Sequence, residues 1–170
     1  MKIRSGLVGL MISSTLVGTV QAGEVCYTPR WGTAMTMCTT PVSSCQRMLG
    51  QFQLMLKKVT DGPGKRRLKL SGPMYGEMNP DQTLNHILGD DRARGLLYTS
   101  GDTLVEAIPL DKCLIQVKEE LYISQGSGIF TGASGQITVS GELNTCSGVN
   151  EFDVVPNDDQ ICFHQAIFEY

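Results

Sequence analysis

The sequence predicts an all-β fold: a small antiparallel β-barrel of about eight strands, stapled by disulfides. Three observations support this prediction: short segments in which apolar and polar residues alternate, glycine-rich turns between those segments, and six cysteines in a chain with little helical pattern. Short alternating segments separated by turn residues are typical of sandwiches and barrels. Closing the sheet into a barrel also removes the exposed edges that invite aggregation.

The first 22 residues have the pattern of a secretory signal peptide. Lys2 and Arg4 supply positive charge, residues 7–20 are mostly apolar, and Ala22 offers a small residue at the cleavage site. The apolar run is shorter than the roughly 20 residues that span a bilayer. We therefore expect cleavage after Ala22, one β-barrel domain over residues 23–170 without a stable membrane span, and a secreted or periplasmic location.

All six cysteines follow the expected cleavage point: Cys26, Cys38, Cys45, Cys113, Cys146 and Cys162. An even number of cysteines in an exported chain indicates disulfides. The chain has no C-x-x-C motif and only two histidines, so we expect neither a zinc site nor a redox catalyst. The sequence does not determine the pairing, but Cys146 and Cys162 flank a short segment and we expect them to pair.

The first part of the expected domain is ambiguous. Residues 24–45 are rich in threonine and contain two prolines, which predicts irregular chain or a short strand held by cysteines. In residues 43–60, apolar side chains recur at helical spacing after two serines that suit a helix start. In the same segment Phe52, Leu54 and Leu56 alternate as in a strand. Both a short N-terminal helix and a strand stay open.

A strong turn signal, DGPGK at residues 61–65, ends this ambiguous segment. In the following residues Leu68 and Leu70 alternate with charge, so we expect the basic run KRRLK at 65–69 to be the solvated face of a strand. The alternative is a phosphate-binding patch. Residues 72–83 have the composition of a loop.

Residues 85–95 are interpreted as a short turn of helix that ends at Gly89. Residues 95–110 then form two short apolar segments around Ser100-Gly101-Asp102. Because small and turn-forming residues connect hairpin strands, we expect a hairpin here.

The clearest strand is KCLIQVKEELYIS at residues 112–124. Successive side chains of a strand point to opposite faces, so the odd-numbered residues form a buried row. Glu119 stands in this row between Val117 and Leu121. Burial raises the pKa of a carboxyl group unless a cation or donor pairs with it, which makes Glu119 a candidate general acid or base in an apolar cavity. Two other interpretations stay open. Glu119 is buried and hydrogen-bonded to an arginine or to backbone amides, in a structural role, or a bulge turns it outward.

The next segment, GSGIFTGASGQITVSG at residues 126–141, raises the question of a phosphate-binding loop. Such a loop is followed by a helix, but residues 136–143 alternate as a strand. The chain also lacks the Gly-Lys-Ser or Gly-Lys-Thr of a P-loop. We interpret the glycines as two turns around a short strand, and we expect no nucleotide or other cofactor.

This segment, with the preceding LYISQGSG, resembles the G-T-G-x-F-x-G-A-x-G-x-(I/V)-x-x-x-G pattern of the allene oxide cyclase and dirigent superfamily of β-barrels. The resemblance covers about residues 94–145. The resemblance implies a small antiparallel barrel with an apolar interior. Members of this superfamily are often oligomeric, so the resemblance leaves open whether this chain forms a homo-oligomer. Some members act on hydrophobic oxylipins or guide coupling of phenolic radicals. The plant cyclases do not share the six cysteines as a framework. The first half of the chain, where the cyclases keep part of their polar cavity residues, does not align with them, so no catalytic position is carried over.

Other ionisable residues are weaker candidates. His86 and the cluster Asp90-Asp91-Arg92-Arg94 would form either an acid/base pair at a barrel mouth or a polar turn with surface ion pairs. Asp102 is interpreted as a turn former, and His164 as a strand-end residue. No G-x-S-x-G elbow occurs. The formal net charge of −3 argues against a nucleic-acid partner.

These observations predict an exported barrel that binds a small apolar ligand or serves a structural role. A barrel of about eight strands holds one small ligand or fills its interior with side chains. The first alternative is an isomerase or cyclase-type enzyme that uses Glu119. The second is a solid-cored oligomeric interaction module. Catalysis usually requires several converging polar groups, and the sequence places one charged residue on an inward row.

Overall fold

A computed structural model describes residues 22–41, 43, 45–59, 61 and 65–166, so the expected signal peptide up to residue 21 lies outside the described part. The described residues include ten strands and the 3-10 turn η2 (Gly128–Phe130), which confirms the predicted all-β class. The strands are β1 (Ala22–Cys38), β2 (Arg47–Lys58), β3 (Arg67–Met78), β4 (Leu84–Gly89), β5 (Leu96–Thr99), β6 (Thr103–Pro109), β7 (Leu114–Gly126), β8 (Ser134–Asn144), β9 (Val149–Val154) and β10 (Ile161–Ala166).

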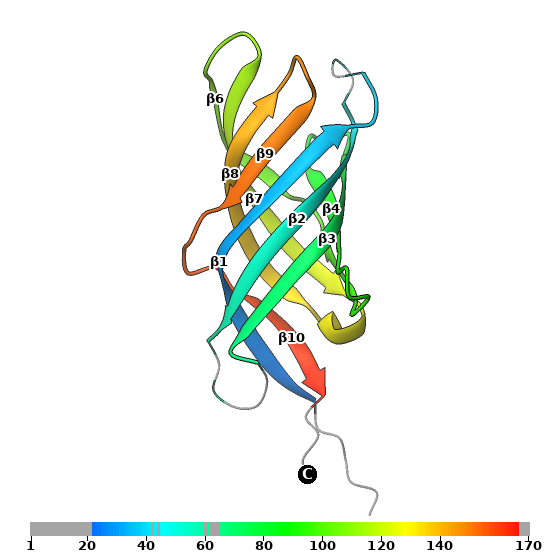
Figure 1. Ribbon diagram of the computed structural model, residues 1–170, viewed down its shortest axis with the longest axis vertical. Coiled ribbons are helices and arrows are strands. Elements are labelled where there is room, and N and C mark those ends of the chain that lie inside the picture. Colours follow the sequence, from blue (N-terminus) through cyan, green and yellow to red (C-terminus); the bar gives the residue numbers. More distant parts are fainter. Residues whose placement is uncertain (1–21, 42, 44, 60, 62–64, 167–170) are drawn as a thin grey trace, which may run out of the picture.

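The strands close into an antiparallel barrel (Figure 1). The ring runs β1-β2-β3-β4-β5-β7-β8-β9 and returns to β1. The two remaining strands extend existing positions. β6 follows β5 along β7, and β10 pairs with the part of β1 that β9 does not cover. Ten strands therefore occupy eight positions, which confirms the predicted strand number.

Aromatic side chains fill the lower end of the barrel as drawn in Figure 1, where β10 and η2 lie. Tyr27 stacks on Phe163 with ring centroids 5.3 Å apart, and Phe130 meets Phe163 edge-on at 5.5 Å. All three residues are buried, together with Leu56 and Ile161. This end of the barrel is a packed core.

The ambiguous segment at residues 43–60 is a strand over its described part, so the helical alternative is wrong. β2 pairs along its length with both β1 and β3. The alternating residues Phe52, Leu54 and Leu56 are buried, whereas Leu49 of the helical set is exposed. Ladder hydrogen bonds on both sides and one apolar face decide in favour of the strand.

Three further sequence expectations are corrected by pairing between distant segments. β1 is a long strand, not irregular chain, because β2, β9 and β10 all pair with it. β3 continues into the expected loop as far as Met78, and the residues expected to form a helical turn before Gly89 belong to strand β4. The partner strands supply hydrogen bonds that these short segments could not obtain alone.

The glycine-rich segment forms the corner between β7 and β8, as expected, but its centre is η2 and not a short strand. A Cβ at Gly126 would lie 2.1 Å from the backbone oxygen of Phe130, and Gly128 has φ of +61°. Only glycine fits both positions without strain. The tight turn brings Phe130 into the lower core.

All six cysteines form disulfides: Cys26–Cys162, Cys38–Cys45 and Cys113–Cys146. The expected Cys146–Cys162 pair is therefore wrong. Cys146 lies in the turn between β8 and β9 at the upper end of Figure 1, whereas Cys162 lies on β10 at the lower end. Three disulfides indicate an oxidising compartment. Within the described ranges, no helix has the length and apolar character needed to cross a bilayer.

Candidate functional site

Glu119 points into the barrel, as its place in the alternating row of β7 predicts. Its exposed fraction is 4%, and Val117, Leu121 and Ile123 of the same row are also buried. Glu119 opposes Val139 of β8 in the strand register. The outward-turning bulge is therefore excluded as the explanation of this carboxylate.

His86 reaches the same interior from β4. It lies between Leu84 and Leu88 on the buried face of that strand, and all three side chains are buried. The imidazole packs over Gly76, its register partner on β3, where a Cβ would lie 3.0 Å from the ring carbon Cδ2. The absence of a side chain at Gly76 gives the ring its space.

Asp102 is the residue that the sequence interpretation misplaced. It is fully buried, and β5 and β6 on either side of it do not form the expected hairpin. Both strands pair with β7 in the same direction, and residues 100–102 interrupt a single strand position. The backbone of Asp102 exchanges two hydrogen bonds with Leu84, at 2.8 and 2.9 Å. This bridge to β4 holds the backbone of residues 100–102 against the barrel wall and turns the side chain of Asp102 inward.

The carboxylate of Asp102 accepts hydrogen bonds from three elements. Oδ2 lies 2.7 Å from Nδ1 of His86 and also accepts the hydroxyl of Thr99. Oδ1 accepts the backbone N–H of Tyr122 at 2.7 Å. The Thr99 oxygen in turn accepts the backbone N–H of His86 at 2.7 Å. Asp102 therefore orients His86 through a closed network of hydrogen bonds.

Glu119 stands beside this network without joining it. Its Oε1 is 3.9 Å from His86 Nδ1, beyond hydrogen-bond distance, and is the only buried side-chain oxygen or nitrogen without a partner among the described residues. Burial raises the pKa of Glu119 to about 7, an effect that His86 opposes and the charge of Asp102 reinforces. A buried carboxyl group that titrates near neutrality is a recognised mark of functional sites.

The three side chains also have the composition of a metal site. Their donor atoms lie within 4.8 Å of one another in the described part of the chain, and imidazole with carboxylates suits zinc and other transition metals. In this arrangement, however, Nδ1 of His86 and Oδ2 of Asp102 are hydrogen-bonded to each other. A metal ion would have to displace that hydrogen bond. The expectation that the protein holds no metal stays a prediction.

Two interior cavities meet at Glu119. The larger has a volume of about 130 Å³ and lies at the upper end of the barrel in Figure 1, near the Cys38–Cys45 disulfide. Its lining is mainly apolar and includes Met78 and Leu104, which are partly exposed, so the cavity reaches the surface. The smaller has a volume of about 50 Å³. Phe152, Met74 and Glu119 line both. We call the larger one the mouth cavity.

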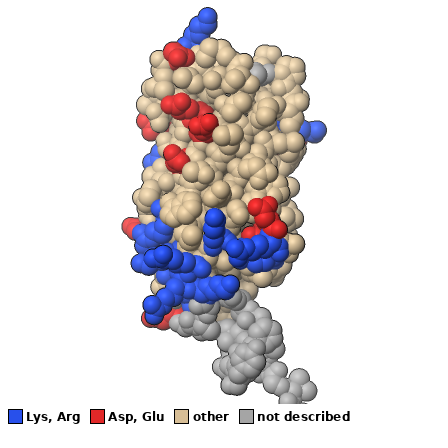
Figure 2. All heavy atoms as spheres, viewed as in Figure 1, with Lys and Arg blue, Asp and Glu red and all other residues tan. Residues whose placement is uncertain are grey.

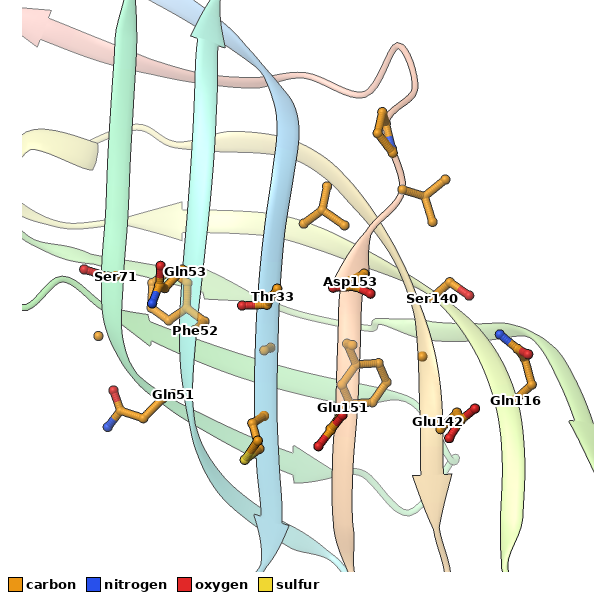
Figure 3. Close-up of a pocket in the computed structure, with 18 of the residues that line it drawn as sticks. Thr33, Gln51, Phe52, Gln53, Ser71, Gln116, Ser140, Glu142, Glu151 and Asp153 are labelled. Atoms are coloured by element: carbon orange, nitrogen blue, oxygen red, sulfur yellow. The ribbon is translucent and has the colours of Figure 1, made fainter. Parts of the chain in front are cut away.

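A separate and larger groove, of about 940 Å³, lies on the outer wall (Figure 3). We call it the outer groove. Amide and hydroxyl groups line it together with the carboxylates of Asp91, Glu142, Glu151 and Asp153. No Lys, Arg or His is among its described lining residues. The smaller interior cavity backs onto this groove, and the two share Thr33, Ala34, Phe52, Gln53, Phe152 and Val154.

The remaining sequence candidates lie away from the interior cluster. Asp90 and Arg94 form an ion pair at 2.7 Å in the turn between β4 and β5, and Arg94 also donates to the backbone oxygen of Lys69. The guanidinium of Arg94 holds the pKa of Asp90 below its usual value. His164 is exposed on β10. The partner of His86 is thus Asp102, and the 90–94 cluster is a polar turn.

Comparison of the chain with protein-family models, with curated proteins and with solved structures finds no match in any of the three.

Proposed function

We propose that the protein binds a small, mainly apolar molecule in the mouth cavity and that Glu119 accepts a hydrogen bond from it. The unpartnered Oε1 of Glu119 at the wall of this cavity carries the proposal. A buried carboxylate without a partner is costly. A ligand that brings one donor group would satisfy it.

The size of the mouth cavity limits the ligand. An apolar cavity of about 150 Å³ is enough to hold benzene, and the mouth cavity has about 130 Å³. The lining supplies thioether and aromatic surface from Met48, Met74 and Phe152, which packs well against small rings. The proposed ligand class is therefore a small aromatic or alicyclic compound with a hydroxyl or amine group. This class agrees with the resemblance to barrels that handle apolar substrates.

Phenol and toluene test this proposal because they have the same shape and differ in one donor group. We expect both to bind, as measured by calorimetry at a pH where Glu119 is ionised. In Glu119→Leu the ratio of phenol to toluene affinity should fall about 10- to 100-fold, because a hydrogen bond to a charged acceptor contributes about 1.5–3 kcal/mol.

Glu142→Leu is the matched control, since Glu142 is exposed on β8 and lines the outer groove. Its affinity ratio should equal that of the unmodified protein. An unchanged ratio in Glu119→Leu, or failure of both compounds to bind, would contradict the proposal.

A second candidate function is proton transfer of the isomerase type, and the pKa of Glu119 near 7 favours it. A base with this pKa accepts a proton from carbon and returns it at neutral pH. We expect the protein to catalyse exchange of the α-protons of cyclohexanone with deuterated water, and NMR measures the rate of this exchange. The rate should rise with pH to a plateau above about 7 and vanish in Glu119→Gln. Equal rates in the two proteins would exclude this second function.

A further inference from the structure

Cationic side chains collect on one part of the outer wall, although the chain as a whole carries a net charge of −3. Figure 2 shows Lys and Arg over the lower part of this face and most of its Asp and Glu above them. The segment from residue 57 to 69 contains six Lys and Arg and one acidic residue, Asp61. Arg30 of β1 and Arg92 of the β4–β5 turn are exposed as well. The fold thus gathers charges that are scattered along the sequence.

The strand register places these charges side by side. Lys57 of β2 directly opposes Arg67 of β3, and Lys69 opposes Met55 two residues further along. Like charges directly opposite each other destabilise a strand pair. No carboxylate of the described residues forms an ion pair with Arg30, Lys57, Arg67 or Lys69. This arrangement lowers stability unless an anionic partner neutralises it.

The single tryptophan of the chain lies in the same patch. Trp31 opposes Met55, the register partner of Lys69, and its exposed fraction is 47%. Val59, which follows the two lysines at the end of β2, is exposed too. An exposed indole among cations is typical of surfaces that lie at a membrane interface, where the ring enters the headgroup layer and the cations bind phosphates. We call Arg30, Trp31, Lys57, Arg67 and Lys69 the basic patch.

We propose that the basic patch docks the barrel onto a membrane surface that contains anionic lipids. The outward face of three neighbouring strands, β1, β2 and β3, presents the patch. The disulfides place the protein in an oxidising compartment, where membrane surfaces, more than nucleic acids, are the resident polyanions. The mouth cavity lies at the other end of the barrel, so docking leaves it open to solvent.

Trp31 is a built-in probe for the test. We expect its fluorescence emission to shift to the blue when vesicles of phosphatidylcholine with phosphatidylglycerol are added to the disulfide-intact protein. Phosphatidylcholine alone should produce no shift, and high salt should reverse the shift. Lys57→Gln/Arg67→Gln should weaken binding about 25-fold, because each basic residue near an anionic surface contributes about 5-fold. Both side chains are exposed, so the variant should fold normally.

Lys112→Gln/Lys118→Gln is the matched control, because it removes the same charge from the upper part of the barrel. It should retain vesicle binding within about 3-fold. Equal loss in the two double variants would contradict the proposal, since net charge and not the patch would then decide binding. Binding to a single-stranded DNA oligonucleotide without binding to vesicles would also overturn it. Sedimentation with vesicles without a blue shift would contradict the position of Trp31 at the interface.

Discussion

Replacing Asp102 by alanine should destabilise the barrel by about 3–5 kcal/mol, because removing one partner from a buried charged network leaves the others unpaired. The substitution deprives the His86 imidazole, the Thr99 hydroxyl and the Tyr122 backbone N–H of their acceptor. Asp102 is fully buried, so water cannot replace the carboxylate without opening the core. The free energy of unfolding, measured in urea with the disulfides intact, gives the loss directly.

Asp111→Ala is a matched control for this experiment. Asp111 also accepts two backbone N–H groups, from Cys113 and Leu114, but it is exposed. Water replaces those hydrogen bonds, so the loss should be small beside that of Asp102→Ala. If Asp102→Ala costs no more than Asp111→Ala, the buried network does not hold the barrel together and its role here is wrong.

Glu119 should make the stability of the protein fall as pH rises through neutrality. Burial raises its pKa from 4.5 to about 7 in the folded state, so between these values the folded protein binds more protons than the unfolded chain. The contribution of Glu119 to the free energy of unfolding is therefore fully present below about pH 4.5, and it is lost as pH rises through about 7. The shift corresponds to about 3 kcal/mol of unfolding free energy. Urea unfolding at several pH values between 5 and 8 measures it.

Glu119→Gln should remove this dependence on pH, because the amide does not ionise. It should also make the protein more stable than the unmodified one at pH 8, where burying the charge is most costly. Glu142→Gln, on the exposed outer wall, should retain the dependence. A Glu119→Gln variant that keeps the full pH dependence would show that another group causes it.

The barrel and the position of Glu119 could be predicted from sequence because both depend on local alternation. Apolar residues occupy alternate positions of β7 on both sides of Glu119, as Val117 and Leu121 do, and period-two alternation identifies the buried face of a strand directly. The strand alternation of residues 136–143 excludes a phosphate-binding helix, and the glycines before it allow the tight corner seen at Gly126 and Gly128.

The inward position of His86, which the sequence analysis names as a candidate, could have been predicted by the same reasoning. Leu84, His86 and Leu88 alternate in the sequence as Val117, Glu119 and Leu121 do, and all are buried. The signal was masked by Gly89 and the charged residues that follow, which favour a helical turn when that short segment is considered alone. Pairing of β4 with β3 and β5 supplies the missing strand context.

Asp102 could not have been predicted. Ser-Gly-Asp has the composition of a hairpin turn, and nothing local distinguishes such a turn from an interruption within one strand position. The difference arises because β7 is long enough to pair with β5 at one end and β6 at the other. The same holds for the disulfides, because the closed barrel decides which strands and turns bring two cysteines together.

The central claim is that Glu119 is a buried carboxyl group beside the His86–Asp102 pair that changes protonation near neutral pH. A carbon-13 NMR titration of the glutamate carboxyl carbons measures this directly, with the Glu119 signal assigned by its loss in Glu119→Gln. We predict a midpoint at about pH 7 for this one signal. A midpoint near the ordinary value of 4.5 would mean that the carboxylate is solvated or paired, and it would contradict the account of the site.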